Sequence, residues 1–502
     1  MTDHMTGTVT SYTTEKGCAV TSHSLSLSAT LCAPASVCMH RCLQVPELVS
    51  IVCSHLQGPR HWEIFEVGHP KRGDLAVLAR TSTVFSSHAL RLIWNSATLM
   101  NLLSCLPSDS FELRTTGEGY FTKYIMQLLR PLQNSDFERV HVYAPLVQHL
   151  FSDPNFADLS SVFPSASPWL SENMLPNLQG LYWMHGENDF QRIDHFLTPQ
   201  LTTIRIPHTS LAALKLLSSL ALQCPQLTDV TLFPSGRTGF SIAGRIHGLD
   251  VSFEHLSHLP GLRHLRLGEL PSTLPTYDDE PSFPSLQTLY FSSEIESPFR
   301  FLEWGNQIPL VGFTAECPAF STADEVHRLF SAAVGGISHF HLTEFAFDNE
   351  FDSFDSSDST NFLIRSSSLR SLFCFVKLVS VSVLSAVGID LDDPTVTDMA
   401  RSWRHIECLE LQSYYGTAAP RTTLQCLEAF PKYCPHLSKL SIAFDALVIP
   451  TSPGDLSLES LKHLDVEASP YCNSTRCSPI HCEHFPESEE YHNALRFLRG
   501  GC

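Results

Sequence analysis

The sequence predicts an α/β solenoid, in which short parallel strands alternate with helices, preceded by a small module of three helices. Two observations lead to this prediction. One short apolar pattern recurs along most of the 502 residues at the spacing of a solenoid, and a separate helical periodicity precedes it. The composition is that of a folded chain, since 43% of the residues are hydrophobic and only 17% are charged.

Three apolar stripes with helical spacing form the N-terminal module. The first begins at Pro46, because proline is favoured in the first turn of a helix. The second is expected to begin at Asp74, whose carboxylate can cap a helix. The stripes consist of Leu48, Ile51, Val52, His55 and Leu56, then Leu75, Leu78 and Ala79, and finally Phe85, Leu90, Ile93 and Trp94.

The pattern apolar-x-x-apolar-x-apolar defines the repeat. A strand turns alternate side chains to one face, and a single strand cannot bury that face without a neighbour stacked against it. Neighbouring copies lie mostly about 23 to 35 residues apart, with longer gaps near an acidic loop. The copies are Leu178/Leu181/Trp183, Leu201/Ile204/Ile206, Leu227/Val230/Leu232, Leu262/Leu265/Leu267, Leu286/Leu289/Phe291, Ile337/Phe340/Leu342, Leu378/Val381/Val383, Ile406/Leu409/Leu411, Leu437/Leu440/Ile442 and Leu461/Leu464/Val466, with Phe137/Val140/Val142 as an earlier outlier.

Helices are expected between the strands. Two are legible, one over residues 211–220 and one behind Asp393-Pro394 that carries Val396, Met399 and Trp403. Several joints from helix to strand contain proline two residues before leucine, and proline cannot continue a helix. These prolines are Pro176, Pro225, Pro260, Pro284 and Pro435. An ordinary α/β domain with parallel strands is the alternative to a repeat array.

The repeats resemble leucine-rich repeats of an irregular kind, in which the asparagine or cysteine expected after the third apolar position is mostly missing. The N-terminal helices resemble an F-box. Together they are similar to the large fungal family of F-box-like proteins with degenerate leucine-rich repeats. The residues that match the F-box pattern are Leu43, Pro46, Glu47, Leu48, Ile51, Leu56, Asp74, Leu75, Ala79, Phe85, Leu90 and Trp94.

The resemblance implies a non-catalytic substrate-recognition adaptor of a Skp-cullin-F-box ubiquitin ligase. Its N-terminal helices would bind a Skp-type adaptor, and through it the cullin, while the repeats would hold an unknown protein target. The expected adaptor-binding residues are Leu43, Pro46, Glu47, Leu48, Ile51, Val52, Leu56, Leu75, Leu78 and Trp94. Two alternatives remain. The three helices could merely cap the end of the solenoid, or the repeats could form an interaction scaffold with no ligase role.

The target site is expected on the sheet face that points away from the core. In each repeat, the residue between the last two apolar positions lies on that face, and stacking aligns these residues. They are Tyr182, Arg205, Thr231, Arg266, Tyr290, His341, Ser382, Glu410, Ser441 and Asp465. Tyrosine and arginine are common binding hot spots, so we predict that Tyr182, Arg205, Arg266 and Tyr290 bind the target. The alternative is that they are ordinary exposed strand residues.

Charge and motifs disfavour other classes of function. The net charge of −20 argues against a nucleic-acid partner. The sequence contains none of the phosphate-binding, serine hydrolase or zinc protease motifs that we sought, so we expect no catalytic residues, no cofactor and no metal. A hydrolase without an ordered motif is the remaining enzyme alternative.

Three groups of residues are candidate metal sites. His339 and His341 could share a strand face but have no third ligand nearby. The acidic segment 348–358 lacks the glycine and glutamate of a calcium loop, so a solvated insertion is expected. The last group has the spacing C-x4-C-x4-C-x-H rather than C-x2-C, so free thiols are expected instead of zinc. It comprises Cys472, Cys477, Cys482 and His484.

The predicted organisation has five parts. These are a disordered Ser/Thr-rich tail (1–38), the F-box-like module (39–108), a connecting segment (109–170), the repeat array (171–470) and an irregular C-terminal tail that contains cysteines (471–502). We expect no secretory signal in 1–37 and no membrane span in 372–389, whose alternation is that of a strand. The 16 scattered cysteines indicate a reducing compartment, the cytoplasm or nucleus.

Overall fold

The computed structural model describes residues 45 to 466, apart from 58–69, 118–122, 155–156, 161, 163–173, 186–190, 208–215, 217–218, 221, 234–255, 258, 269, 271–282, 320, 350–360, 415–419 and 446–457. The predicted tails lie outside this range, and so do Leu43 and the cysteine-histidine group beginning at Cys472. Most of the helix expected over 211–220 and nearly all of the acidic segment 348–358 also lie outside the described residues.

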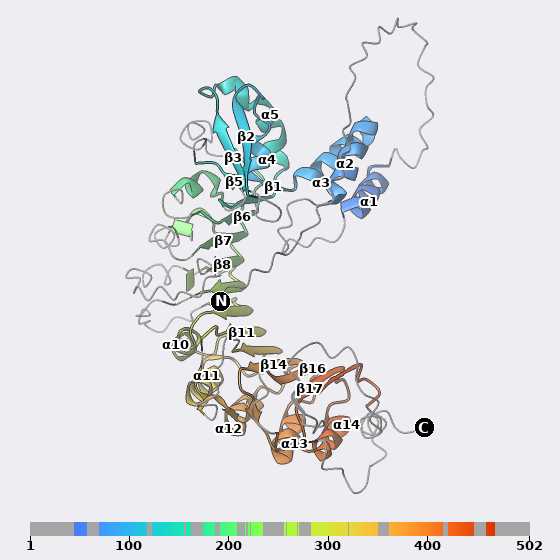
Figure 1. The fold of residues 1–502 in the computed structure, drawn as a ribbon, viewed down its shortest axis with the longest axis vertical. Helices are drawn as coiled ribbons and strands as arrows, with labels where there is room; N and C mark the ends of the chain where they lie inside the picture. The colour runs from blue at the N-terminus through green and yellow to red at the C-terminus, as the bar shows by residue number, and fades with distance from the viewer. Residues whose placement is uncertain are drawn as a thin grey trace, which may run out of the picture.

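A parallel sheet of 13 strands runs along the array, and its strands stand in chain order (Figure 1). This is the arrangement expected of a solenoid, because each repeat adds its strand beside the previous one. The sheet extends further toward the N terminus than residue 171. Its strands are β1 (Ser96–Thr98), β4 (His149–Ser152), β6 (Gly180–Trp183), β7 (Thr203–Pro207), β8 (Asp229–Phe233), β9 (His264–Leu267), β10 (Thr288–Ser292), β11 (Gly312–Glu316), β12 (Glu344–Asp348), β14 (Ser380–Ser385), β16 (Cys408–Ser413), β17 (Lys439–Ile442) and β18 (His463–Asp465).

Helices connect consecutive strands, and they lie on the outer face of the sheet. Figure 1 shows α10 to α13 along the outer side of the bend, with β11, β14 and β16 along its inner side. The helix predicted behind Asp393-Pro394 is confirmed as α13, and Asp392 caps it by accepting a hydrogen bond from the Thr395 N–H at 2.9 Å. The connecting elements are η5 (Gln191–Phe196), α10 (Glu296–Trp304), α11 (Ala323–Gly336), α12 (Ser366–Ser371), η7 (Leu372–Cys374), α13 (Asp393–Ser402), η8 (Leu424–Glu428) and α14 (Ala429–Tyr433).

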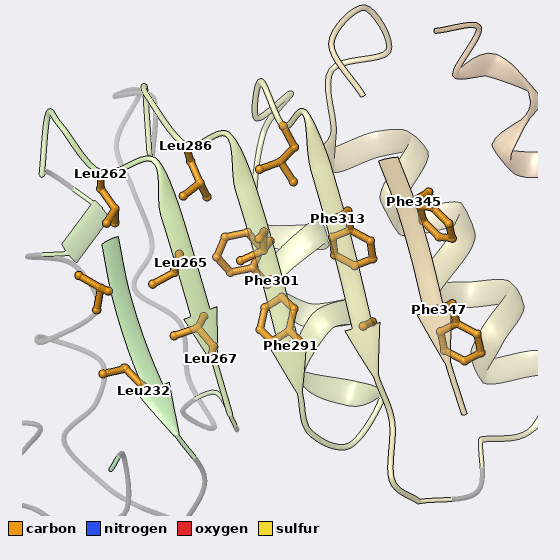
Figure 2. Packing of buried hydrophobic residues seen from close by; sticks show 14 of the residues in the cluster. Leu232, Leu262, Leu265, Leu267, Leu286, Phe291, Phe301, Phe313, Phe345 and Phe347 are labelled. Carbon is orange, nitrogen blue, oxygen red and sulfur yellow. The ribbon is translucent and has the colours of Figure 1, made fainter. Parts of the chain in front are cut away.

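The core lies between the sheet and these helices. The central residues of neighbouring repeats are paired in register, so that Leu265 on β9 lies beside Leu289 on β10, which lies beside Phe313 on β11. Each of the three side chains is 1% exposed. Figure 2 shows the buried leucines and phenylalanines from these strands, with Phe301 of α10 packed behind them.

The proline joints are β-turns. The N–H of Leu178 donates to the carbonyl of Leu175 at 3.1 Å, across Pro176. The same bond, at 3.2 Å, joins Leu437 to Cys434. Proline is suited to the second position of a β-turn because its ring fixes φ near −65°. Each turn directs the first leucine of the next repeat inward, and both Leu178 and Leu437 are fully buried.

The predicted outlier strand Phe137/Val140/Val142 is wrong. These residues belong to η3 (Asn134–Phe137) and α5 (Glu138–Tyr143), and Val142 is 65% exposed. The buried residues are Phe137, Val140, Ala144 and Val147, which follow helical spacing. Two apolar residues three positions apart, such as Phe137 and Val140, occur both in helices and in the repeat pattern. The sequence alone therefore did not distinguish a helix from a repeat strand here.

The predicted strand Ile337/Phe340/Leu342 is also wrong. Phe340 lies in a turn after α11 and is 70% exposed. The strand in this repeat is β12, where Phe345 and Phe347 face the core. Leu342/Phe345/Phe347 is a second match to the same pattern, and it overlaps the first at Leu342.

This shift changes the position of two histidines. His339 and His341 lie in the turn before β12 and do not share a strand face. His339 Nε2 is 2.8 Å from the Val334 carbonyl oxygen, and His341 Nδ1 is 3.0 Å from Ser338 Oγ. On the inner sheet face, the position expected for His341 is occupied by Ala346.

The N-terminal module contains three helices, α1 (Pro46–Gln57), α2 (Pro70–Thr81) and α3 (Thr83–Trp94). The predicted start at Pro46 is confirmed. Asp74 lies within α2 rather than at its cap, because α2 begins at Pro70. The module has a small core of its own, made of Val49, Cys53, Leu75 and Ala89.

One residue, Asn95, separates the module from the sheet. α3 ends at Trp94 and β1 begins at Ser96. The Asn95 carbonyl accepts hydrogen bonds from the N–H groups of Gln148 and His149 at 2.9 and 2.8 Å. The Trp94 ring stacks on Tyr143 with their centroids 4.7 Å apart. The module is therefore fixed directly to the first two strands of the array.

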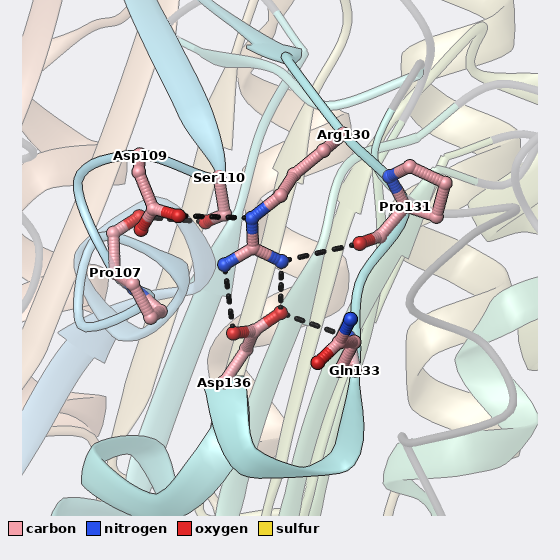
Figure 3. A network of polar contacts seen from close by, with 7 residues as sticks. All are labelled: Pro107, Asp109, Ser110, Arg130, Pro131, Gln133 and Asp136. Carbon is pink, nitrogen blue, oxygen red and sulfur yellow. Dashed lines mark hydrogen bonds and ion pairs between the residues drawn. The ribbon is translucent and has the colours of Figure 1, made fainter.

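A small second sheet lies beside the first repeats. β2 (Phe111–Thr116) and β3 (Lys123–Leu128) form an antiparallel hairpin, and β5 (Ala157–Asp158) pairs with β3. Arg130 anchors its end (Figure 3), with Nε 3.0 Å from Asp109 and two bonds of 2.7 and 2.9 Å to Asp136. Hydrogen bonding to Arg130 lowers the pKa of Asp136. The remaining short elements are α4 (Leu99–Leu103), η4 (Ala144–Leu146), β13 (Ile364–Arg365) and β15 (Ile389–Asp390).

Within the described ranges, no helix has the length and apolar character needed to cross a membrane.

Candidate functional site

The first candidate surface is an apolar stripe along α1. It consists of Val45, which immediately precedes the helix, and of Leu48, Ile51 and Val52 on it, and these residues are 40 to 51% exposed. At 100° per residue these positions fall within one third of the helix circumference. The stripe therefore presents four apolar side chains side by side to solvent.

The adjoining flank of α1 holds the helix in the module. Val49 and Cys53 are fully buried there, and Leu56 packs against the same small core. α1 thus has two apolar faces, whereas a helix that only covers a core needs one. Its polar residues, among them Ser50 and Ser54, occupy the rest of the surface.

The described residues among those expected to bind the adaptor fall into three groups. Pro46, Glu47, Leu48, Ile51 and Val52 are exposed together on α1. Leu75, in contrast, is 1% exposed in the module core, and Leu56 and Leu78 pack against that core, so they support the helices from inside. Trp94 is engaged with Tyr143 at the junction. Val45 was missed, although its spacing of three residues from Leu48 would have indicated it.

The second candidate surface is the inner face of the sheet. Strand register places Tyr182, Arg205, Thr231, Arg266 and Tyr290 side by side across β6 to β10. This is the alignment that the repeat pattern predicts. Tyr182 and Tyr290 are more than one hundred residues apart in the sequence, but they lie only a few strands apart in the sheet, at about 4.8 Å per strand.

The first two members of this row are buried rather than open. Tyr182 is 5% exposed and Arg205 is 7% exposed. The Tyr182 ring stacks on Phe151 with centroids 4.3 Å apart, and the Arg205 guanidinium lies 4.9 Å from the centre of the Tyr182 ring. Their contacts stabilise the sheet face, and neither matches the expectation of an exposed strand residue.

Arg266 and Tyr290 form the accessible part of the row. Arg266 is exposed and its guanidinium lies 4.7 Å from the centre of the Tyr290 ring. The Tyr290 hydroxyl donates to Glu316 on the next strand, and burial together with this contact raises the pKa of Tyr290. Beside Arg266, His264 Nδ1 lies 2.7 Å from Thr288 Oγ1.

Asp229 is the carboxylate next to this group on β8. Burial raises its pKa, and the positive charges of Arg205, His264 and Arg266 act in the opposite direction. Thr231 donates a hydrogen bond to it at 3.4 Å. The charges of two guanidinium groups thus act on one carboxylate on this part of the face.

The inner face becomes acidic toward the C-terminal strands. Glu344, Asp348, Glu410 and Asp465 lie on β12, β16 and β18. Several are engaged by neighbours: Glu410 pairs with Lys439, and Asp348 accepts a hydrogen bond from the Tyr414 hydroxyl at 2.9 Å.

Several nucleophilic groups in the described part of the chain are buried. No cluster of three potential metal ligands occurs there. Burial raises the pKa of Cys224 and of Cys434 to about 12, so these thiols are poor nucleophiles. Ser152 Oγ lies 2.7 Å from His185 Nε2, but both residues are at most 5% exposed, which keeps the pair away from a substrate in solution.

Comparisons with known proteins give the following result. No family model and no curated protein matches the chain. Solved structures with a similar arrangement include the Rad7–Elc1 complex of yeast, with 12% identity over 80% of this chain and 88% of that chain, at a TM-score of 0.32. The leucine-rich-repeat-containing protein LegL7 of Legionella pneumophila has 13% identity over 64% of this chain and 97% of its own, at a TM-score of 0.25. TM-scores this low do not establish a shared function.

Proposed function

We propose that this protein is a non-catalytic recognition subunit of a cullin ubiquitin ligase. The apolar stripe of α1 docks a Skp-type adaptor, and the inner face of the repeat sheet holds a protein target. The observation that carries the proposal is the second apolar face of α1, which the module itself leaves uncovered. The free cysteines of the described chain support a reducing location, the cytoplasm or nucleus.

The stripe is large enough to matter energetically. Fully burying a leucine, isoleucine or valine side chain contributes about 1.5–3 kcal/mol. Because the four residues are 40 to 51% exposed, covering them would contribute roughly 3–5 kcal/mol in total. Association costs at least about 4 kcal/mol, so the adaptor must also contact surface beyond the stripe.

The packing of the module favours docking over simple capping. α1 and α2 pack on each other and on α3, and α3 meets the array through β1 and η4. A cap would lay its apolar face on the end of the solenoid. Here the stripe lies on the helix that precedes the other two, and its exposed side chains face solvent.

Co-purification with a Skp-type adaptor tests the proposal. Leu48→Asp places a charge in the stripe, and we expect it to abolish adaptor binding because an unpaired charge in an apolar interface is costly. Ser50→Asp is the matched control, since it adds the same charge at an exposed polar position of α1. Adaptor binding should survive the control.

Both variants should retain the circular dichroism of the wild type. If Leu48→Asp and wild type bound the adaptor equally, the stripe would not be the docking surface. If no adaptor bound even the wild type, the alternative of an interaction scaffold without a ligase role would replace the proposal.

A further inference from the structure

The guanidinium of Arg266 differs from several other guanidinium groups of the protein in its partners. Its side chain is exposed at the middle of the inner face. Within the described part of the chain, its guanidinium makes its ring contact with Tyr290 but no hydrogen bond and no ion pair. Arg130, Arg370 and Arg421, in contrast, are all paired with aspartates. Among the described residues, none therefore occupies the N–H donors of Arg266.

The guanidinium is held in place before any ligand arrives. It lies over the Tyr290 ring, and the hydroxyl of that ring is bonded to Glu316, so the platform is itself fixed. An arginine that stacks on an aromatic ring still presents the N–H groups at its edge. Fixing it in advance reduces the entropy lost on binding.

Polar groups surround this cation. His264 precedes Arg266 by two residues on β9, so both lie on the inner face. Thr288 lies beside His264 on β10. Asp229 is the nearest carboxylate on β8; it accepts a hydrogen bond from Thr231, and the charge of Arg205 acts on it as well as that of Arg266.

We propose that Arg266, on its Tyr290 platform, anchors an acidic side chain of the target protein. This inference rests on the proposed function, in which the inner face holds the target. A carboxylate or a phosphoryl group can accept two parallel hydrogen bonds from a guanidinium, and such bonds are among the strongest in proteins.

The surroundings also define the rest of the bound segment. Glu316 lies two strands from Arg266 and Glu344 three strands away, and both add negative charge to the same face. A uniformly acidic segment would be repelled there. The ligand is therefore a single acidic side chain within an otherwise neutral or basic stretch.

Peptide arrays test this anchor. We would use 12-residue peptides with randomised flanks and a central residue fixed as glutamate, phosphoserine or alanine, probed with the full chain. The wild type should bind the glutamate or phosphoserine array at least about tenfold more tightly than the alanine array. Stronger binding to the glutamate array would indicate a carboxylate ligand, and stronger binding to the phosphoserine array would indicate a phosphoryl ligand.

Two variants locate the effect. Arg266→Gln should remove the preference for acidic peptides. Arg263→Gln is the matched control, because Arg263 is also exposed and lies three residues earlier, before β9 begins. It should leave the preference intact.

The anchor is overturned if the wild type shows no acidic preference, or if Arg266→Gln retains it. Adaptor co-purification is measured on the same samples. Either of these two results, in a protein that still binds the adaptor, rejects the anchor alone, whereas failure of the wild type to bind the adaptor rejects the proposed function.

Discussion

Leu289→Ala tests the register of the solenoid most directly. Leu289 is the central apolar residue of β10 and is 1% exposed. It lies in register between Leu265 on β9 and Phe313 on β11, and helices close the layer behind it. Every side of this side chain is therefore in contact with other parts of the core.

The expected cost follows from this environment. The substitution removes three carbon groups, which is about 2.4 kcal/mol at roughly 0.8 kcal/mol per buried group. Strands held in register on both sides cannot collapse into the space, so a cavity contribution is added. We expect a total of about 3–4 kcal/mol, within the range of buried leucine-to-alanine changes.

Hydrogen exchange is the suitable assay, because long repeat arrays do not unfold in a single two-state step. Exchange should accelerate in β9, β10 and β11 and stay unchanged in the N-terminal module, since each repeat contacts only its neighbours. Leu222→Ala is the matched control. Leu222 is 84% exposed, and the change there should shift stability by no more than about 0.5 kcal/mol.

The same reasoning applies to Leu265, Leu409 and Leu440, each of which is also 1% exposed at the centre of its repeat. If Leu289→Ala left exchange in β9 to β11 at the wild-type rate, the side chain would not be a core residue. The register described above would then be wrong.

Two further predictions concern the regions flanking this core. Asp136→Asn should destabilise the protein at neutral pH. Because Arg130 lowers the folded pKa of Asp136, the wild type should lose this advantage progressively as the pH falls below about 4, so the difference in unfolding free energy between wild type and variant should be smaller at pH 3 than at pH 7. Equal stability of the two proteins at pH 7 would contradict this. Gly336→Ala should lower the melting temperature, because a Cβ there meets the backbone carbonyl of Leu302, whereas Gly335→Ala has open space and should be neutral or stabilising. Similar melting of both glycine variants would show that α10 and α11 do not approach as closely as described.

Much of the sheet could be predicted because the repeat pattern has a direct physical cause. Leu265 and Leu409 were placed correctly, since a strand with a buried face needs apolar residues at alternate positions. β11 was missed because its second inward residue is Ala315, which carries little apolar signal. β4 was missed because its second inward residue, after Leu150, is the polar Ser152, whose hydroxyl is satisfied by His185 only after folding.

The site was less predictable than the fold. The pattern correctly aligned Tyr182 with Arg266 on one face, but it contains no information on which members stay accessible. Tyr182 is covered by a stack that involves Phe151, a residue on a strand that the pattern did not identify. On α1, the sequence indicated an apolar face at Leu48. Only the structure showed that Val49, and not Leu48, packs into the module, so that the side chain of Leu48 remains exposed after folding.

The one-residue connection at Asn95 has a consequence for how the two binding events are related. A flexible linker of n residues would let its ends explore distances of about 5–6 Å × √n. Here the chain passes from helix to strand with hydrogen bonds on both sides, so almost no such freedom exists. Under the proposed function, a captured protein is carried at a set angle and height above the ligase. Which lysine is modified would then depend on the position of that lysine on the target surface, and not on the motion of a flexible linker between the module and the repeats.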